Sequence, residues 1–231
     1  MASGGFTCFF LWHVIIKNLV EKSVLARSRR MKVKKRMAKK LVMTRKDASV
    51  ADAINLMKKH SIRHLPVVEG GELVGWVTER DIREAYLASL IEQVSMGDIM
   101  IKDPVTVSPE ANLEEAAELL YRHGIGGLPV VDKGKLVGVI TVADIMAAFI
   151  EVMGILQESS RIDVLLGGKP HALENVSRLI RDQGSEIISV GMSAHEDRTK
   201  RVYYLRLTKC DVHALTKRIE AEGYKVVSMT E

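Results

Sequence analysis

Two short segments of the sequence place a hydroxyl and a carboxylate three residues apart at the predicted start of a helix. The first pair is Thr78 and Asp81, and the second is Thr141 and Asp144. A carboxylate accepts hydrogen bonds from the cis-diol of a ribose, and a hydroxyl with the free N–H groups of a helix start receives phosphate. The same spacing forms a capping box, which is worth about 1 kcal/mol and requires no ligand. The residue types therefore leave a nucleoside site and a purely structural cap both open.

Both pairs lie at the end of a long internal repeat. Residues 62–82 (IRHLPVVEGGELVGWVTERDI) return as residues 125–145 (IGGLPVVDKGKLVGVITVADI), at an offset of 63, with 12 of the 21 positions identical and no gap. Each copy contains two predicted strands around a turn, at Gly70-Gly71 in the first copy and at Lys133-Gly134 in the second. Such a repeat predicts a duplicated structural unit.

An amphipathic helix precedes each copy. Residues 48–60 have apolar side chains at helical spacing, with Ser49 as a predicted N-cap, and the pattern returns after Asn112. We expect short strands at Val42 and Val105 before these helices. We also expect a helix after each Thr-x-x-Asp pair, over residues 81–89 and 144–153. The unit is therefore β-α-β-β-α. Because about 60 residues bury little surface alone, two units should pack as a pseudo-twofold pair with facing sheets.

The motifs IRHLPVV, GELVGWVTERDI, GGLPVV and GKLVGVITVADI resemble the two halves of a CBS-domain pair, or Bateman module, over about residues 35–153. The resemblance implies a regulatory protein that binds an adenosine-containing ligand (AMP, ADP, ATP or S-adenosylmethionine), with no cofactor. In CBS pairs each cleft is also lined by the neighbouring unit, so Ile62 and Ile125 are candidates for the opposite site. The residues that match the ligand positions are Thr78, Asp81, Arg63 and His64 for the first site, and Thr141, Asp144, Gly126 and Gly127 for the second.

The two predicted sites differ in charge. Arg63 and His64 would place cationic groups beside the first site, which would then prefer a phosphorylated nucleotide because Arg binds phosphate through a bidentate fork. Gly126 and Gly127 would leave the second site neutral, open to an uncharged or bulkier nucleoside or to none. The alternative is that Arg63 and His64 form a solvated turn.

The last part of the chain has a different pattern, which predicts a ferredoxin-like α+β sandwich of order βαββαβ. Its expected strands and helices cover residues 161–166, 171–183, 186–192, 200–207, 211–222 and 224–229. This order, with a Gly-Pro loop after the first strand, resembles an ACT domain over about residues 160–231. The loop gives the ligand candidates Gly167, Gly168, Lys169, Pro170 and His171.

The acidic residue that usually precedes the Pro-Gly of amino-acid-binding ACT loops is absent, with Lys169 in its neighbourhood. The domain is therefore expected either to dimerise through its sheet edges or to bind a small ligand. A CBS pair followed by an ACT-like domain resembles the AcuB (acetoin utilisation) family. We divide the chain into an extension (1–30), two CBS units (31–93 and 94–156) and an ACT-like domain (157–231).

Basic residues are concentrated at the N-terminal end. Residues 1–46 hold 13 Lys/Arg and one acidic residue, a net charge of +12, whereas the rest of the chain carries −7. This distribution predicts either a tail that binds nucleic acid or anionic lipid, or an upstream extension with Met31 as the true start. The repeat requires nothing before about residue 31, which favours the extension. The apolar run over residues 6–16 is shorter than the roughly 20 residues of a membrane span.

The sequence contains no nucleophile elbow, Walker loop, GxGxxG or metal-ligand spacing, so we expect neither catalysis nor a metal site. Its two cysteines, Cys8 and Cys210, are far apart, which is typical of a reducing cytosol. By analogy with other CBS pairs we expect a cytoplasmic homodimer that controls a further protein, whose identity the sequence does not reveal. A small-ligand sensor with purely structural CBS units is the second hypothesis, and nucleic-acid binding through the N-terminus is the third.

Overall fold

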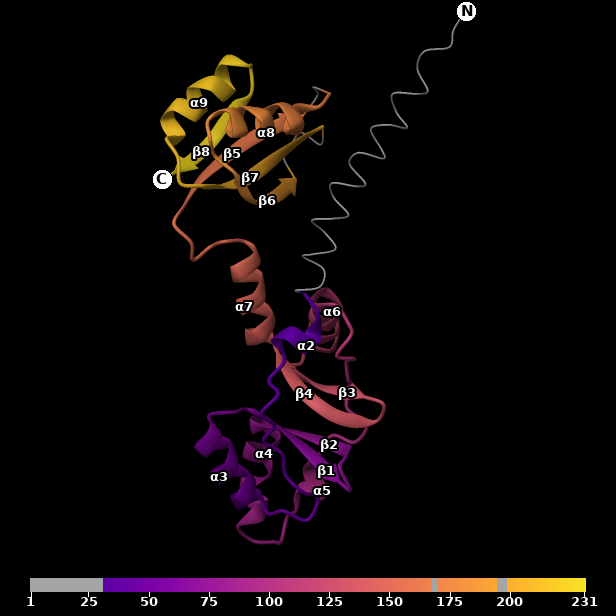
Figure 1. The fold of residues 1–231 in the computed structure, drawn as a ribbon. Helices are drawn as coiled ribbons and strands as arrows, with labels where there is room; N and C mark the ends of the chain where they lie inside the picture. The colour runs from indigo at the N-terminus through magenta and orange to yellow at the C-terminus, as the bar shows by residue number, and fades with distance from the viewer. Residues whose placement is uncertain (1–30, 168–169, 195–198) are drawn as a thin grey trace, which may run out of the picture. The chain divides into compact units, whose positions relative to one another are not determined.

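The computed structural model describes residues 31–167, 170–194 and 199–231 (Figure 1). The chain divides into two compact units, with the boundary in the sequence between Ile145 and Met146. The predicted N-terminal extension over residues 1–30 lies outside the described residues.

The first unit contains both copies of the repeat. Its elements in chain order are α2 (Val33–Arg36), α3 (Val50–His60), β1 (His64–Glu69), β2 (Glu72–Thr78), α4 (Glu79–Ser89), α5 (Met96–Ile99), α6 (Leu113–His123), β3 (Gly127–Asp132), β4 (Lys135–Thr141) and α7 (Val142–Val152), the last of which continues past the unit boundary.

The two predicted hairpins form as expected. Gly70 and Gly71 have φ of +60° and +88°, and Lys133 and Gly134 have φ of +48° and +81°. Two consecutive positive φ values are what a two-residue hairpin turn requires, because that backbone matches the twist of the flanking strands. A register shift also recurs at corresponding positions, between Val67 and Val68 in the first hairpin and between Val130 and Val131 in the second.

The predicted facing sheets are wrong. The two hairpins join into one four-stranded sheet of order β1-β2-β4-β3, in which β2 and β4 share the single pair Glu72↔Lys135. The strands expected at Val42 and Val105 are also wrong, since isolated bridges take their place two residues later, at Thr44 and Val107. Thr44 exchanges backbone hydrogen bonds with Pro66 and Val68, and the chain then turns toward α3, so the pairing is too short to form a strand.

The helices after the Thr-x-x-Asp pairs begin two residues earlier than predicted. Thr78 is the N-cap of α4, and Asp81 is the third residue of this helix rather than its first. Helix α7 likewise begins at Val142. The N-cap predicted at Ser49 is confirmed, because its side chain accepts a hydrogen bond from the N–H of Asp52 at 3.1 Å.

The short helices α2 and α5 are exchanged between the two copies of the repeat, which the sequence did not reveal. Helix α2 precedes the first copy, but Val33 N donates to Ala111 O in the second copy at 3.0 Å. Helix α5 precedes the second copy, but Met96 N donates to Ala48 O in the first copy at 2.9 Å. Met96 is fully buried in the core of the first copy, together with Leu65, Val67 and neighbouring side chains. Each copy therefore completes its core with a segment from the other.

A methionine after each exchanged helix lies against a glycine of the opposite hairpin. A Cβ atom at Gly75 would collide with the Met100 side chain, and a Cβ atom at Gly138 would collide with the Met37 side chain. The two contacts are related by the repeat, because Gly75 and Gly138 lie 63 residues apart, as do Met37 and Met100. The glycines at these positions therefore allow the exchanged segments to pack closely on β2 and β4.

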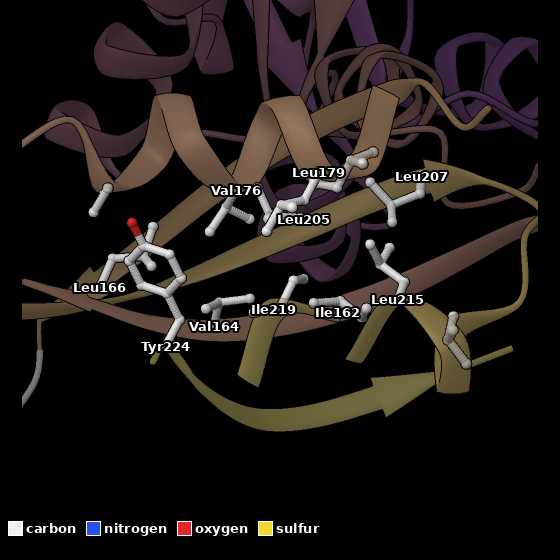
Figure 2. Packing of buried hydrophobic residues seen from close by; sticks show 13 residues of the cluster. Ile162, Val164, Leu166, Val176, Leu179, Leu205, Leu207, Leu215, Ile219 and Tyr224 are labelled. Carbon is white, nitrogen blue, oxygen red and sulfur yellow. The ribbon is translucent and has the colours of Figure 1, made fainter. Parts of the chain in front are cut away.

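The second unit has the predicted βαββαβ order. Its elements are β5 (Ser159–Gly167), α8 (Ala172–Asp182), β6 (Ile187–Ala194), β7 (Lys200–Thr208), α9 (Val212–Ala221) and β8 (Lys225–Thr230). The sheet order is β6-β7-β5-β8 with every neighbouring pair antiparallel. This is the split βαβ topology of the ferredoxin-like sandwich. Figure 2 shows α8 and α9 directing Val176, Leu179, Leu215 and Ile219 toward the side chains of one sheet face.

The predicted loop candidates of the second unit are described in part. Gly168 and Lys169 lie outside the described residues. Gly167 ends β5, where a Cβ atom would lie 2.5 Å from Thr199 O. Pro170 follows in a turn, and His171 is the N-cap of α8 in the left-handed conformation, with its Nδ1 3.1 Å from Glu174 Oε2.

Candidate functional site: the cleft at Asp81

Both Thr-x-x-Asp pairs form capping boxes with the same geometry. Asp81 Oδ2 accepts hydrogen bonds from Thr78 N at 2.8 Å and from Thr78 Oγ1 at 2.7 Å. Asp144 Oδ2 accepts the equivalent bonds from Thr141 at 2.8 and 2.7 Å. Within the described part of the chain, Oδ1 of each carboxylate accepts no hydrogen bond. Each aspartate thus closes its helix with one oxygen and retains the other as an acceptor.

A third capping box shows that the cap alone does not identify a site. Ser95 N donates to Asp98 Oδ2 at 2.9 Å at the start of the short helix α5. This hydrogen bond and that of the Ser95 hydroxyl, which is the larger effect, lower the pKa of the exposed Asp98. What distinguishes Asp81 is therefore its surroundings.

Asp81 lies in a cleft of about 570 Å³ between the two copies of the repeat. This size is within the range of small-molecule pockets. The first copy contributes β1, β2 and α4, and the second contributes the segment after α5, the end of α6 and the first half of β3. The lining residues are His64, Trp76, Thr78, Arg80, Asp81, Glu84, Ile101, Pro104, Val105, His123, Gly124, Ile125, Gly126, Gly127 and Pro129.

The structure brings most of the residues predicted for the first site together in this cleft. Arg63 is outside it, and Gly126 and Gly127 line it. Thr78, Asp81 and His64 line the cleft, and so does Ile125 from the opposite unit, as expected for a cleft shared between units. Gly126 and Gly127, predicted for the second site, also line it. Ile62 and Arg63 instead line a separate pocket of about 760 Å³ between α3 and α4.

Arg63, predicted for the first site, is therefore not part of the lining of the Asp81 cleft. The match to the family's ligand positions had assigned the loop before β1 to the helix that follows it in the same unit. In the fold, the corresponding loop of the second CBS unit, Ile125-Gly126-Gly127, lines the cleft. The cleft consequently has two glycines where a guanidinium was expected.

His64 forms the contact between the two loops. Added Cβ atoms at Gly126 and Gly127 would lie 3.1–3.3 Å from its imidazole ring, so these glycines admit the ring. The ring also stacks on Trp76, with 5.7 Å between centroids and 27° between planes. Burial, and after it the charge of Arg63, lower the pKa of His64 from its usual 6.5, against the opposing effect of Asp81. His64 is therefore neutral near pH 7, in contrast to the cation predicted.

The charged pair in the cleft was missed at the sequence level. Arg80 Nε donates to Glu84 Oε1 at 2.9 Å along one face of α4. The i,i+4 spacing was a signal for the pair, but only the tertiary structure shows that this face of α4 lines the cleft.

The described residues contain no cluster of metal-ligating side chains. In the same part of the chain, no helix combines the length and apolar character needed to cross a membrane.

Comparison with known proteins identifies the family. The CBS domain family matches residues 33–88 and 96–151. A CBS domain-containing protein of Bacillus subtilis, YhcV, is 33% identical over 114 residues, which cover 49% of this chain and 81% of that protein. The chain therefore belongs to the CBS domain family, and the two matched segments form its CBS pair.

This chain spans less than a third of the length of some other relatives. Inosine-5'-monophosphate dehydrogenases of Korarchaeum cryptofilum and Methanocaldococcus jannaschii are 37% and 32% identical over 57% and 69% of this chain, which spans only 27% and 32% of their lengths. The structure of a Vibrio cholerae protein assigned to acetoin utilization (AcuB) is 35% identical, with a TM-score of 0.50, over 55% of this chain and 96% of that one. Arabidopsis thaliana CBSX2 in complex with AMP is 31% identical, with a TM-score of 0.47, over 52% and 97%.

Proposed function

We propose that the protein is a non-catalytic regulatory sensor that binds an adenosine-containing ligand between its CBS units. The observation that carries the proposal is the position of Asp81. One of its carboxylate oxygens is engaged in the cap, and the other remains an acceptor within a cleft of about 570 Å³. The cap at Ser95 and Asp98 differs, because Asp98 is exposed and only Ser95, not this carboxylate, lines the neighbouring pocket of about 660 Å³.

The lining of the cleft suits a nucleoside. Asp81 Oδ1 supplies the acceptor for a ribose hydroxyl, as an acidic residue does in dinucleotide-binding folds. Trp76 from the first CBS unit, with Val105 and Ile125 from the second, supplies a slot for the base. Because both units contribute to the walls, a ligand in the cleft would bias their relative arrangement by its difference in affinity for the two states.

The test compares Asp81→Asn with Asp98→Asn. Both variants replace the carboxylate of a capping box by an amide that still offers one acceptor oxygen, but only Asp81 lies in the cleft. Binding of AMP, ADP, ATP, S-adenosylmethionine and adenosine is measured by isothermal titration calorimetry and thermal shift. A one-site ligand at 100 times its Kd should stabilise the protein by about 2.7 kcal/mol.

We expect at least one of these compounds to bind, Asp81→Asn to weaken the binding, and Asp98→Asn to leave it unchanged. No binding by any of them to the unsubstituted chain would refute adenosine sensing. Equal weakening by both variants would assign the effect to the caps and their helices, and not to the cleft.

For the remainder of the chain we propose the role implied by the AcuB resemblance. The βαββαβ unit is an ACT-like domain that relays or receives a second signal, through a sheet edge or its Gly167–His171 loop. The protein is a cytoplasmic homodimer that regulates another protein, in acetoin or related carbon metabolism. The order of strands in this unit supports the proposal. Deletion of residues 157–231 should retain ligand binding and abolish regulation of the target.

A further inference from the structure

The sheet of the second unit has two different faces. Helices α8 and α9 cover one of them, which holds the buried core (Figure 2). Residues directly opposite on neighbouring strands lie on the same face. The strand registers place Arg161 opposite Arg206, and they place Asp163 opposite Tyr204. These four residues alternate with the core residues along β5 and β7, so they lie on the face away from both helices.

The strands of this sheet carry an excess of positive charge. They hold five basic residues, which are Arg161, Lys200, Arg201, Arg206 and Lys225, and one acidic residue, Asp163. The carboxylate of Asp163 is already engaged, because it accepts hydrogen bonds from Arg161 Nε at 2.7 Å and from Arg161 Nη2 at 2.9 Å. Arg206 donates to the Ser159 hydroxyl at 2.7 Å and forms no ion pair with the residues that the structure describes. The strands therefore attract an anion.

Tyr204 and Arg161 form a stacked pair on the two central strands. The guanidinium carbon of Arg161 lies 5.0 Å from the centroid of the Tyr204 ring, and the double hydrogen bond to Asp163 fixes the guanidinium plane. The hydroxyl groups of Tyr204 and Ser193 share a hydrogen bond of 2.8 Å, which holds the ring. Gly191 lies opposite Tyr204 on the edge strand β6, and a glycine inside a strand is typical of a place where another group approaches closely.

A planar stacking surface beside an arginine without a carboxylate partner suits a nucleobase that is joined to a phosphate. Unpaired bases stack on aromatic rings and on guanidinium planes, and an arginine binds phosphate through its fork of donors. A sheet face is flat, whereas sites for small molecules are concave. An extended strand that contacts several positions therefore fits this face better than a free nucleotide.

We propose that the face of the second unit that carries Arg161, Tyr204 and Arg206 binds single-stranded nucleic acid. A base stacks on the Tyr204–Arg161 pair, and Arg206 binds a phosphate of the backbone. This role is independent of adenosine sensing by the CBS pair, and it requires no contribution from the basic residues at the N-terminal end.

The experiment uses the full chain and labelled single-stranded RNA and DNA of about 12 nucleotides, within the usual range of site sizes. Fluorescence anisotropy gives the Kd at several salt concentrations for Tyr204→Leu, Tyr204→Phe and Arg206→Gln. Tyr121→Leu is the control for the ring, because Tyr121 is 88% exposed on α6 of the CBS pair. Arg178→Gln is the control for the charge, because Arg178 is exposed on α8, which covers the other face of the sheet.

We expect Tyr204→Leu to weaken binding about tenfold through loss of base stacking, and Tyr204→Phe to retain it because the ring remains. Arg206→Gln should weaken binding and reduce the slope of log K against log salt by about 0.7, the contribution of one phosphate contact to a single strand. Both controls should leave the Kd unchanged. A duplex of the same sequence should bind more weakly, because its paired bases cannot stack on the sheet.

Absence of binding to either single strand at about 100 µM protein, the weak end of non-specific affinities, would overturn the proposal. Equal affinity for the duplex, or equal effects of Tyr204→Leu and Tyr121→Leu, would also overturn it, because the binding would then come from charge elsewhere in the chain. Equally strong competition by poly-glutamate would assign the face to an acidic protein segment instead. If circular dichroism shows that Tyr204→Leu does not fold, an unchanged salt slope for Arg206→Gln is sufficient to refute the proposal.

Discussion

Truncation of Met96 tests whether the two CBS units share their cores. Met96 follows the first copy of the repeat in the sequence, at the start of α5. Its side chain nevertheless has 0% exposure and lies in the core of the first CBS unit. Met→Ala substitutions at fully buried sites cost 2–5 kcal/mol, so we expect Met96→Ala to lower the free energy of unfolding by about 3 kcal/mol. For a chain of this size that corresponds to about 6–12 °C in Tm.

The assay is urea denaturation followed by the fluorescence of Trp76, which is 4% exposed in the same unit. A Trp12→Phe background makes Trp76 the sole tryptophan of the sequence. Met43→Ala is the matched control, because Met43 is 45% exposed and exposed substitutions stay within about 0.5 kcal/mol. A loss below about 1 kcal/mol for Met96→Ala, similar to that of the control, would show that α5 does not complete the first core.

Two further predictions concern the interface between the two CBS units. The lowered pKa of His64 means that the unfolded chain takes up this proton at higher pH than the folded chain, so stability is full above about pH 6.5 and declines as the pH falls below it. His64→Gln should therefore lose less stability than the unsubstituted chain between about pH 7.5 and pH 5.5, as measured by urea midpoints; equal losses would contradict the assignment. Gly138→Val should destabilise the protein by about 1–3 kcal/mol, because its side chain would displace Met37 from β4. Thermal unfolding measures this effect, which a second substitution, Met37→Ala, should partly relieve if the steric explanation is right.

Local structure followed from local sequence in most of the chain. The turns at Gly70-Gly71 and Lys133-Gly134 were predictable because their residues tolerate positive φ. The N-caps at Ser49 and Thr78 were predictable because a short polar side chain can bond the N–H three residues later. The βαββαβ order of the second unit followed from apolar periodicity, although most element ends differ by one or two residues.

The predictions from sequence failed where contacts with a segment distant in the sequence determine the structure. Sequence periodicity could not reveal α2 and α5, since four residues are too short for a helical pattern. A signal for their exchange was present in the paired Met37/Gly138 and Met100/Gly75 positions, which obey the repeat offset. It could be interpreted only once the structure had shown which glycine faces which methionine.

The amino-acid sequence by itself determined that the protein is duplicated, where its turns and caps lie, and which residue types could hold a nucleoside. These properties depend on interactions between residues a few positions apart, and the sequence lists those neighbours directly. Only the tertiary structure decided which loop meets which carboxylate, because that pairing joins residues about 45 positions apart across the exchanged units. The placement of Gly126, and not Arg63, beside Asp81 is a consequence of packing that no local pattern encodes.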